Sequence, residues 1–82
     1  MDTDQTSIFT LDALSDELIR QVLNEVYKAL EERGYNPINQ MVGYLMSGDL
    51  GYISSHKDAR KKISRIDRNQ IIEFLLRAYL KD

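Results

Sequence analysis

The apolar residues between Ser15 and Gly34 recur at the spacing of an amphipathic helix, and this periodicity constrains the fold more than any other feature of the chain. Polar and charged residues fill the other half of the helical wheel, which is typical of a surface helix with one buried face. Ser15 is a suitable N-cap, and two carboxylates follow it in the first turn. Gly34 suits the left-handed position after the last turn. We therefore predict a helix that begins near Ser15 and ends before Gly34.

A second helix is predicted between Asn36 and Gly48. Asn36 can accept a hydrogen bond from the first turn, and Pro37 fits the first helical position, where no backbone N–H is needed. Apolar residues cover so much of this helix that it must be packed from more than one direction. Its apolar positions are Ile38, Met41, Val42, Tyr44, Leu45 and Met46.

Two further helices are predicted in the C-terminal half. The first covers residues 56–66, with Ser54 or Ser55 as its cap and Ala59, Ile63 and Ile66 facing inward. The second covers residues 68–81, with Asp67 as its cap. Its apolar residues occupy well over half of the helical wheel, which again exceeds what one neighbour can cover.

The remaining segments are predicted to be a tail and a connector. Residues 1–12 lack helical periodicity and indicate a flexible N-terminal tail. Residues 49–53 indicate a connector with one turn of 3₁₀ helix. The fold class is therefore all-α, a compact bundle of about four short helices over residues 13–82 with a disordered tail.

The apolar surface of the predicted helices indicates self-association. A chain of 82 residues has a small core, and without cysteine it has no disulfide to reinforce it. The wide apolar faces of the second and fourth helices predict that two copies pair as an intertwined homodimer. The predicted interface and packing residues are Tyr35, Asn36, Pro37, Ile38, Met41, Val42, Tyr44 and Leu45.

The sequence gives no pattern for catalysis, a metal or a cofactor. His56 is the only histidine, and the two serines before it on a helix start do not face its ring. A histidine on the surface or at a cap is the favoured interpretation. Gly34, Gly43 and Gly48 are too far apart for a phosphate-binding loop, and Gly43 more simply permits close packing. With no apolar run long enough to span a membrane, we expect a cytoplasmic protein that is not an enzyme.

The charge of −2 is unevenly distributed. Residues 1–32 carry eight acidic side chains against two basic ones, whereas residues 57–68 carry six basic against two acidic. Such asymmetry indicates solvated helix faces, two surfaces that attract each other, or a nucleic-acid patch. The candidate basic patch, which could also receive a phosphate group, consists of Arg60, Lys61, Lys62, Arg65 and Arg68.

Three segments resemble one known family. They are "GYNPINQMVGYLMSGD" (34–49), "YISSHKDAR" (52–60) and "RNQIIEFLLRAYL" (68–80), and together they resemble the IreB family of small regulatory phosphoproteins from Gram-positive bacteria. The resemblance implies a helical, cytoplasmic homodimer without enzymatic activity. It also implies phosphorylation of the tail by a membrane-anchored Ser/Thr kinase with PASTA repeats, opposed by a phosphatase, in signalling that governs cell-envelope stress and antibiotic tolerance.

The family's two phosphorylated threonines match Thr3 and Thr6, which precede Phe9, and Ser7 and Thr10 are additional acceptors. We expect phosphate on these threonines to change how the tail meets a surface, and the basic segment is a candidate receptor because Arg and phosphate form charge-assisted pairs. The opposite outcome, in which phosphorylation displaces an acidic tail that already lies on this segment, stays open. The downstream protein is unknown. Two other classes of function remain open, namely a helical nucleic-acid-binding protein that uses residues 57–68, and a structural adaptor between proteins.

Overall fold

The computed structural model describes the backbone of residues 3–81 and the side chains of residues 15–81. Within this range all regular structure is helical, which confirms the predicted all-α class. In chain order the elements are α1 (Thr3–Glu32), α2 (Pro37–Ser47), the 3₁₀ turns η1 (Leu50–Tyr52) and η2 (His56–Asp58), α3 (Ala59–Ser64) and α4 (Arg68–Leu80).

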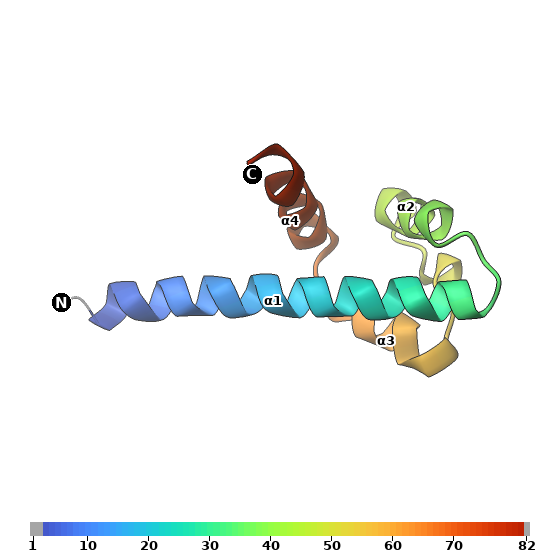
Figure 1. The fold of residues 1–82 in the computed structure, drawn as a ribbon, viewed down its shortest axis with the longest axis horizontal. Helices are drawn as coiled ribbons and strands as arrows, with labels where there is room; N and C mark the ends of the chain where they lie inside the picture. Colours follow the sequence, from blue (N-terminus) through green and yellow to red (C-terminus); the bar gives the residue numbers. More distant parts are fainter. Residues whose placement is uncertain (1–2, 82) are drawn as a thin grey trace.

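The long helix α1 is the element on which the others are assembled. Figure 1 shows α2 and α4 on one side of α1 and α3 on the opposite side. One apolar face of α1 supplies much of the core, as its periodicity predicts. The buried residues are Ile19, Val22, Val26, Ala29 and Leu30 of α1, Tyr44 of α2, Ile53, Ala59, Ile63, Ile66, and Ile71 and Phe74 of α4.

The start of α1 differs from the prediction. The helix begins at Thr3 and not near Ser15, so Ser15 lies inside it and does not act as a cap. No glycine or proline occurs among residues 3–14, so nothing in the covalent chemistry of this segment breaks the helical backbone. The side chains of Thr3 and Thr6 lie outside the described residues, and the flexible tail over residues 1–12 stays a prediction.

The predicted caps of α2 and α4 are confirmed. Asn36 Oδ1 accepts a hydrogen bond from the backbone N–H of Asn39 at 3.1 Å, and Asp67 Oδ1 accepts one from Asn69 at 3.3 Å. Gly48 ends α2 with a left-handed φ of 78°, and its N–H donates to the Tyr44 carbonyl. These hydrogen bonds satisfy groups that a helix terminus otherwise leaves without partners.

The third predicted helix is interrupted. Lys57 and Asp58 have φ values of 54° and 61°, a left-handed conformation that side chains other than glycine rarely adopt. The segment therefore divides into η2 and the short α3. Ser54 Oγ accepts from the His56 N–H at 3.0 Å, whereas Ser55 makes no capping bond with its side chain. Burial of Ala59, Ile63 and Ile66, however, is confirmed.

Candidate functional site

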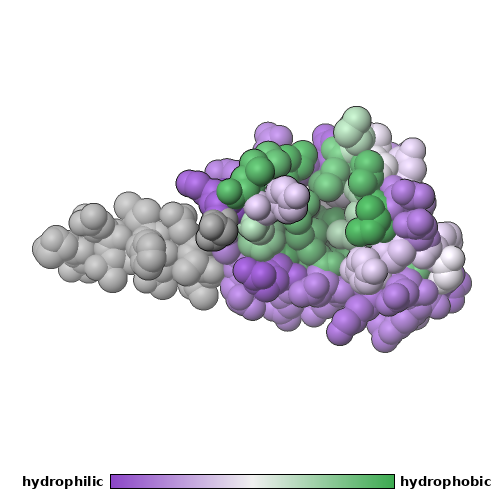
Figure 2. All heavy atoms as spheres, turned by 45° about the horizontal axis from the view of Figure 1, so that its top comes forward, coloured by the Kyte–Doolittle hydropathy of each residue, from purple (hydrophilic) through white to green (hydrophobic). Residues whose placement is uncertain are grey.

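An apolar groove lies between α2 and α4 and is also lined by residues of α1. It has a volume of about 300 Å³. Figure 2 shows the surrounding surface as a hydrophobic region over α2 and α4, bordered by hydrophilic side chains. The groove is lined by Leu23, Asn24, Tyr27, Ile38, Met41, Val42, Leu45 and Leu75.

The outer side of α4 extends this apolar surface. Its exposed residues recur at intervals of three and four, which places them along one side of the helix. Only Ile71 and Phe74 of α4 are buried in the subunit. The exposed apolar residues are Ile72, Leu75, Leu76, Tyr79 and Leu80. Contiguous apolar surface of this kind marks interaction sites in soluble proteins.

The predicted interface residues divide into three groups. Four of them, Ile38, Met41, Val42 and Leu45, lie together along the groove. Tyr44 is only 5% exposed and belongs to the subunit's own core. The other three lie at the start of α2: Tyr35, which is half exposed, Asn36, which caps the helix, and Pro37, which is its first residue.

The orientation of α2 explains why its apolar side faces the groove. Tyr44 points into the core, and the ring of Tyr52 packs directly on Gly43, where a Cβ would come within 2.5 Å of it. Gln40 Nε2 also donates to the Tyr52 carbonyl at 2.9 Å. These contacts fix two sides of α2 and leave the side of Val42 uncovered. They also confirm that Gly43 permits close packing.

Sequence reasoning missed the contributions of α1 and α4 to the groove. Leu23 and Tyr27 of α1 and Leu75 of α4 were not predicted as site residues. The excess of apolar residues on α4 was a signal for Leu75. Leu23 and Tyr27 lie within the apolar half of α1, and periodicity alone cannot separate a core residue from a groove residue.

The basic residues of 57–68 do not form one continuous patch. Lys62 pairs with Glu25 at 3.0 Å, and Arg60 Nε donates to the Ile53 carbonyl at 2.9 Å. Arg68 Nη1 donates to the Leu45 carbonyl at 3.1 Å, and its guanidinium lies against Gly48. Arg68 therefore joins the start of α4 to the end of α2.

The other two predicted patch residues, Lys61 and Arg65, are exposed and lie at different cavities. Lys61 lies with Arg60 beside Ser55 and Asp58, whereas Arg65 lies with Lys62 beside α1. The basic segment thus presents two separate pairs of cations.

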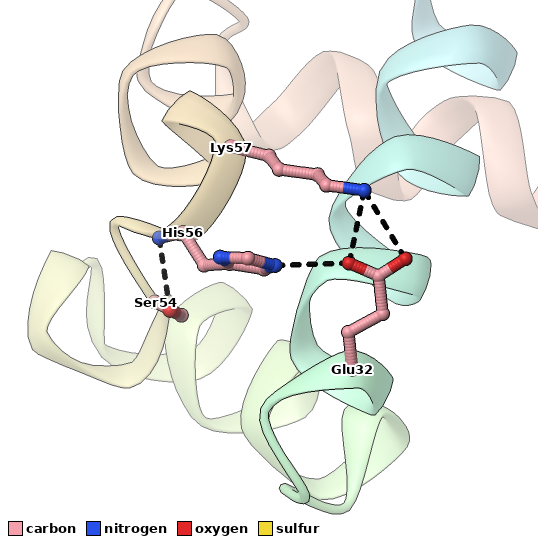
Figure 3. A network of polar contacts seen from close by, with 4 residues as sticks. All are labelled: Glu32, Ser54, His56 and Lys57. Carbon is pink, nitrogen blue, oxygen red and sulfur yellow. Dashed lines mark hydrogen bonds and ion pairs between the residues drawn. The ribbon is translucent and has the colours of Figure 1, made fainter.

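His56 and Lys57 both contact Glu32 at the end of α1 (Figure 3). His56 Nε2 donates to Glu32 Oε1 at 2.9 Å, and Lys57 Nζ lies 3.1 Å from the same oxygen. The hydrogen bond from His56, followed by that from Lys57, lowers the pKa of Glu32. The side chain of His56 is 30% exposed and joins η2 to α1, in line with its predicted place on the surface.

A second polar cluster joins α4 to α1. The guanidinium of Arg77 donates two hydrogen bonds to the carboxylate of Asp16, both at 3.0 Å. This bidentate contact lowers the pKa of Asp16. Nearby, the Arg20 guanidinium lies 5.4 Å from the centroid of the Phe74 ring. These contacts hold the C-terminal half of α4 beside α1.

Among residues 15–81 no three His, Asp or Glu side chains gather where they could hold a metal ion. Within the described part of the chain, none of the helices combines the length and apolar character needed to cross a membrane.

In the described residues, the fold and this surface define a small all-helical protein with an exposed apolar groove. The profile of the family described as "IreB regulatory phosphoprotein" matches residues 4–81. A "UPF0297 protein" of Acetivibrio thermocellus is 45% identical over 82 residues, which is all of this chain and 91% of that protein. The chain belongs to the IreB family, as the three segments predicted.

Proposed function

We propose that this chain is a non-enzymatic regulatory phosphoprotein that acts as a homodimer. A PASTA-type Ser/Thr kinase phosphorylates it on Thr3 and Thr6, and a phosphatase reverses the reaction. The protein acts in the cytoplasm on an unidentified downstream protein, and so modulates tolerance of cell-envelope stress and antibiotics. The observation that carries this proposal is the match of nearly the whole chain to a family described as regulatory phosphoproteins.

The apolar groove supports the homodimer. A single subunit leaves large apolar side chains of α2 and α4 exposed, and a symmetric pair covers the same patch on both copies. The outer face of α4 has the spacing with which an amphipathic helix enters an apolar groove. Pairing also supplies the stabilisation that a small domain without disulfides lacks.

The kinase assignment rests on the N-terminal sequence. Thr3 and Thr6 lie in "DTDQTS", ahead of the helical residues that supply the core. Phosphorylation adds a charge of about −1.5 to −2 and three acceptor oxygens to each threonine, which is enough to change what the segment contacts.

The direct test is phosphorylation by a purified PASTA-type kinase, followed by mass spectrometry of the intact protein and its peptides. We expect phosphate on Thr3 or Thr6 and its loss in the Thr3→Ala/Thr6→Ala double variant. Thr10→Ala is the matched control and should be modified like the wild type. Phosphate that persists in the double variant would overturn Thr3 and Thr6 as the sites, and its absence from the wild type would remove the kinase from the proposal.

The nucleic-acid alternative is weakened by the contacts of the basic segment. Lys62, Arg60 and Arg68 are each bonded to groups of this chain, which leaves fewer cations for phosphate backbones. A DNA or RNA affinity that falls steeply with salt would restore that alternative.

A further inference from the structure

The structure narrows the predicted phosphate-receiving patch to one cavity. We propose that the cavity beside η2 and α3 binds a phosphothreonine of the N-terminal segment of a second copy of the chain. This proposal rests on the proposed function, because that function supplies the phosphothreonine. The cavity has a volume of about 350 Å³ and is lined by Leu50, Ser55, Asp58, Arg60, Lys61 and Ser64.

Arg60 is the anchor of this site. Its Nε donates to the Ile53 carbonyl at 2.9 Å, which fixes the plane of the guanidinium at the edge of the cavity. This bond uses one of its five N–H groups, so the two terminal nitrogens can donate to a phosphate in the bidentate geometry that arginine favours. The arginine is therefore oriented before the ligand arrives, which reduces the entropy lost on binding.

Lys61 and Ser55 supply the other donors. Lys61 is exposed and forms no ion pair with a described residue, unlike its neighbour Lys62, which Glu25 neutralises. Ser55 makes no capping hydrogen bond with its side chain, so its hydroxyl can donate to a ligand. Ser64 is less suitable, because its hydroxyl already donates to the Lys61 carbonyl at 2.8 Å.

Asp58 sets the selectivity of the cavity for a dianion. Its carboxylate lines the same cavity as Arg60 and Lys61, so the three side chains together carry a net charge of one positive unit. An unmodified acidic segment gains little from so small a charge, whereas a phosphate near −2 can bond to both cations directly. The other pair, Lys62 and Arg65, lies beside the Glu25 carboxylate and the apolar side chains of α1.

The length of α1 indicates that the phosphothreonine bound at this site comes from a second copy of the chain. Lys62 contacts Glu25 and Lys57 contacts Glu32, so the site lies beside the C-terminal half of α1. Because α1 is helical from Thr3, Thr6 and Glu25 are nineteen residue steps apart on one helix, a distance of about 28 Å along the α1 backbone. Threonine and lysine side chains together cannot span that distance, and the N-terminal segment of a second chain has no such restriction.

The test is a titration of the ¹⁵N-labelled, unphosphorylated full-length protein with a synthetic peptide of residues 1–12 that carries phosphate on Thr6. The unphosphorylated peptide and inorganic phosphate are titrated in parallel. We expect the phosphopeptide to shift the amide signals of Ser55, Arg60 and Lys61, and the unphosphorylated peptide to leave them unchanged. Lys61→Gln should weaken binding by about tenfold, which corresponds to about 1.4 kcal/mol. Arg65→Gln removes the same charge from the other cation pair and should bind like the wild type.

If Lys61→Gln and Arg65→Gln weakened peptide binding equally, the attraction would be diffuse and the site would be overturned. The absence of amide shifts at millimolar phosphopeptide would also overturn it. A response to inorganic phosphate equal to that of the peptide would leave a phosphate site but overturn recognition of the segment. Shifts in kinase-treated protein that persist when the protein is made monomeric would overturn supply by a second copy. Because the peptide is synthetic, failure of the kinase assay leaves this test intact.

Discussion

Val42→Glu tests whether the groove is a surface for self-association. Val42 lines the groove and is 51% exposed in the single chain. Complete burial of a valine side chain is worth roughly 1.5–3 kcal/mol, so covering its exposed half contributes about 1 kcal/mol per copy. A buried carboxylate without a partner in the interface makes the free energy of dimerisation less favourable by about a further 3 kcal/mol per copy. Because a two-fold dimer uses the same patch twice, the combined loss is roughly 8 kcal/mol.

That loss is large enough to abolish a dimer of ordinary strength. A dissociation constant of about 1 μM corresponds to about 8.2 kcal/mol, so the variant should be monomeric at any practical concentration. The single chain itself should be little affected, because the new carboxylate is solvated there and exposed substitutions usually change stability by less than about 0.5 kcal/mol.

Sedimentation velocity over a micromolar concentration series is the assay. We expect the wild type at twice the 9.5 kDa of one chain and Val42→Glu at 9.5 kDa, with unchanged helical circular dichroism. Leu18→Glu is the matched control, because Leu18 is 53% exposed but lies at the α3 side of α1. A wild type that sediments as 9.5 kDa throughout would refute self-association. A variant that remains dimeric would refute the groove as the surface.

Three further predictions concern stability. Gly48→Ala should lower the free energy of unfolding by about 1–2 kcal/mol in denaturant titrations, because alanine is disfavoured at a φ of 78° and its Cβ would lie 2.8 Å from the Arg68 guanidinium. Ile71→Ala should cost about 2–5 kcal/mol in the same titrations, because Ile71 is fully buried. Arg77→Gln should lower the melting temperature at pH 7. Since Arg77 lowers the pKa of Asp16 in the folded state, this stabilisation is present above the unfolded pKa, about 3.9, and the difference should disappear as the pH falls through the folded value.

Features set by local chemistry were predictable from the sequence. The Asn36 and Asp67 caps, and the left-handed Gly48, depend on hydrogen bonds between residues two to four positions apart. The inward faces of Ala59 and Ile63 follow from helical periodicity, because each is on the only apolar side of its segment. These elements require no knowledge of the tertiary structure.

The groove could be predicted only in part, because it is made by three helices. The sequence places Ile38, Met41, Val42 and Leu45 on one side of α2, and the structure confirms that they lie together. Which helix faces that side depends on the packing of Tyr52 on Gly43, a contact between residues nine positions apart. No pattern within either helix specifies that contact, so the excess of apolar residues on α4 indicates a partner surface but does not place Leu75 opposite α2.

The basic segment differs from the predicted continuous helix over 56–66 at one point. Lys57 and Asp58 adopt left-handed conformations that cost of order 1–3 kcal/mol each. Such a cost persists only where surrounding contacts offset it, and Glu32 supplies one of them through Lys57. After this break α3 begins with Ala59 in the core, and Arg60 lies at the cavity beside η2. Of the two strained residues, Asp58 lines the cavity that we propose receives the phosphate, whereas Lys57 pairs with Glu32.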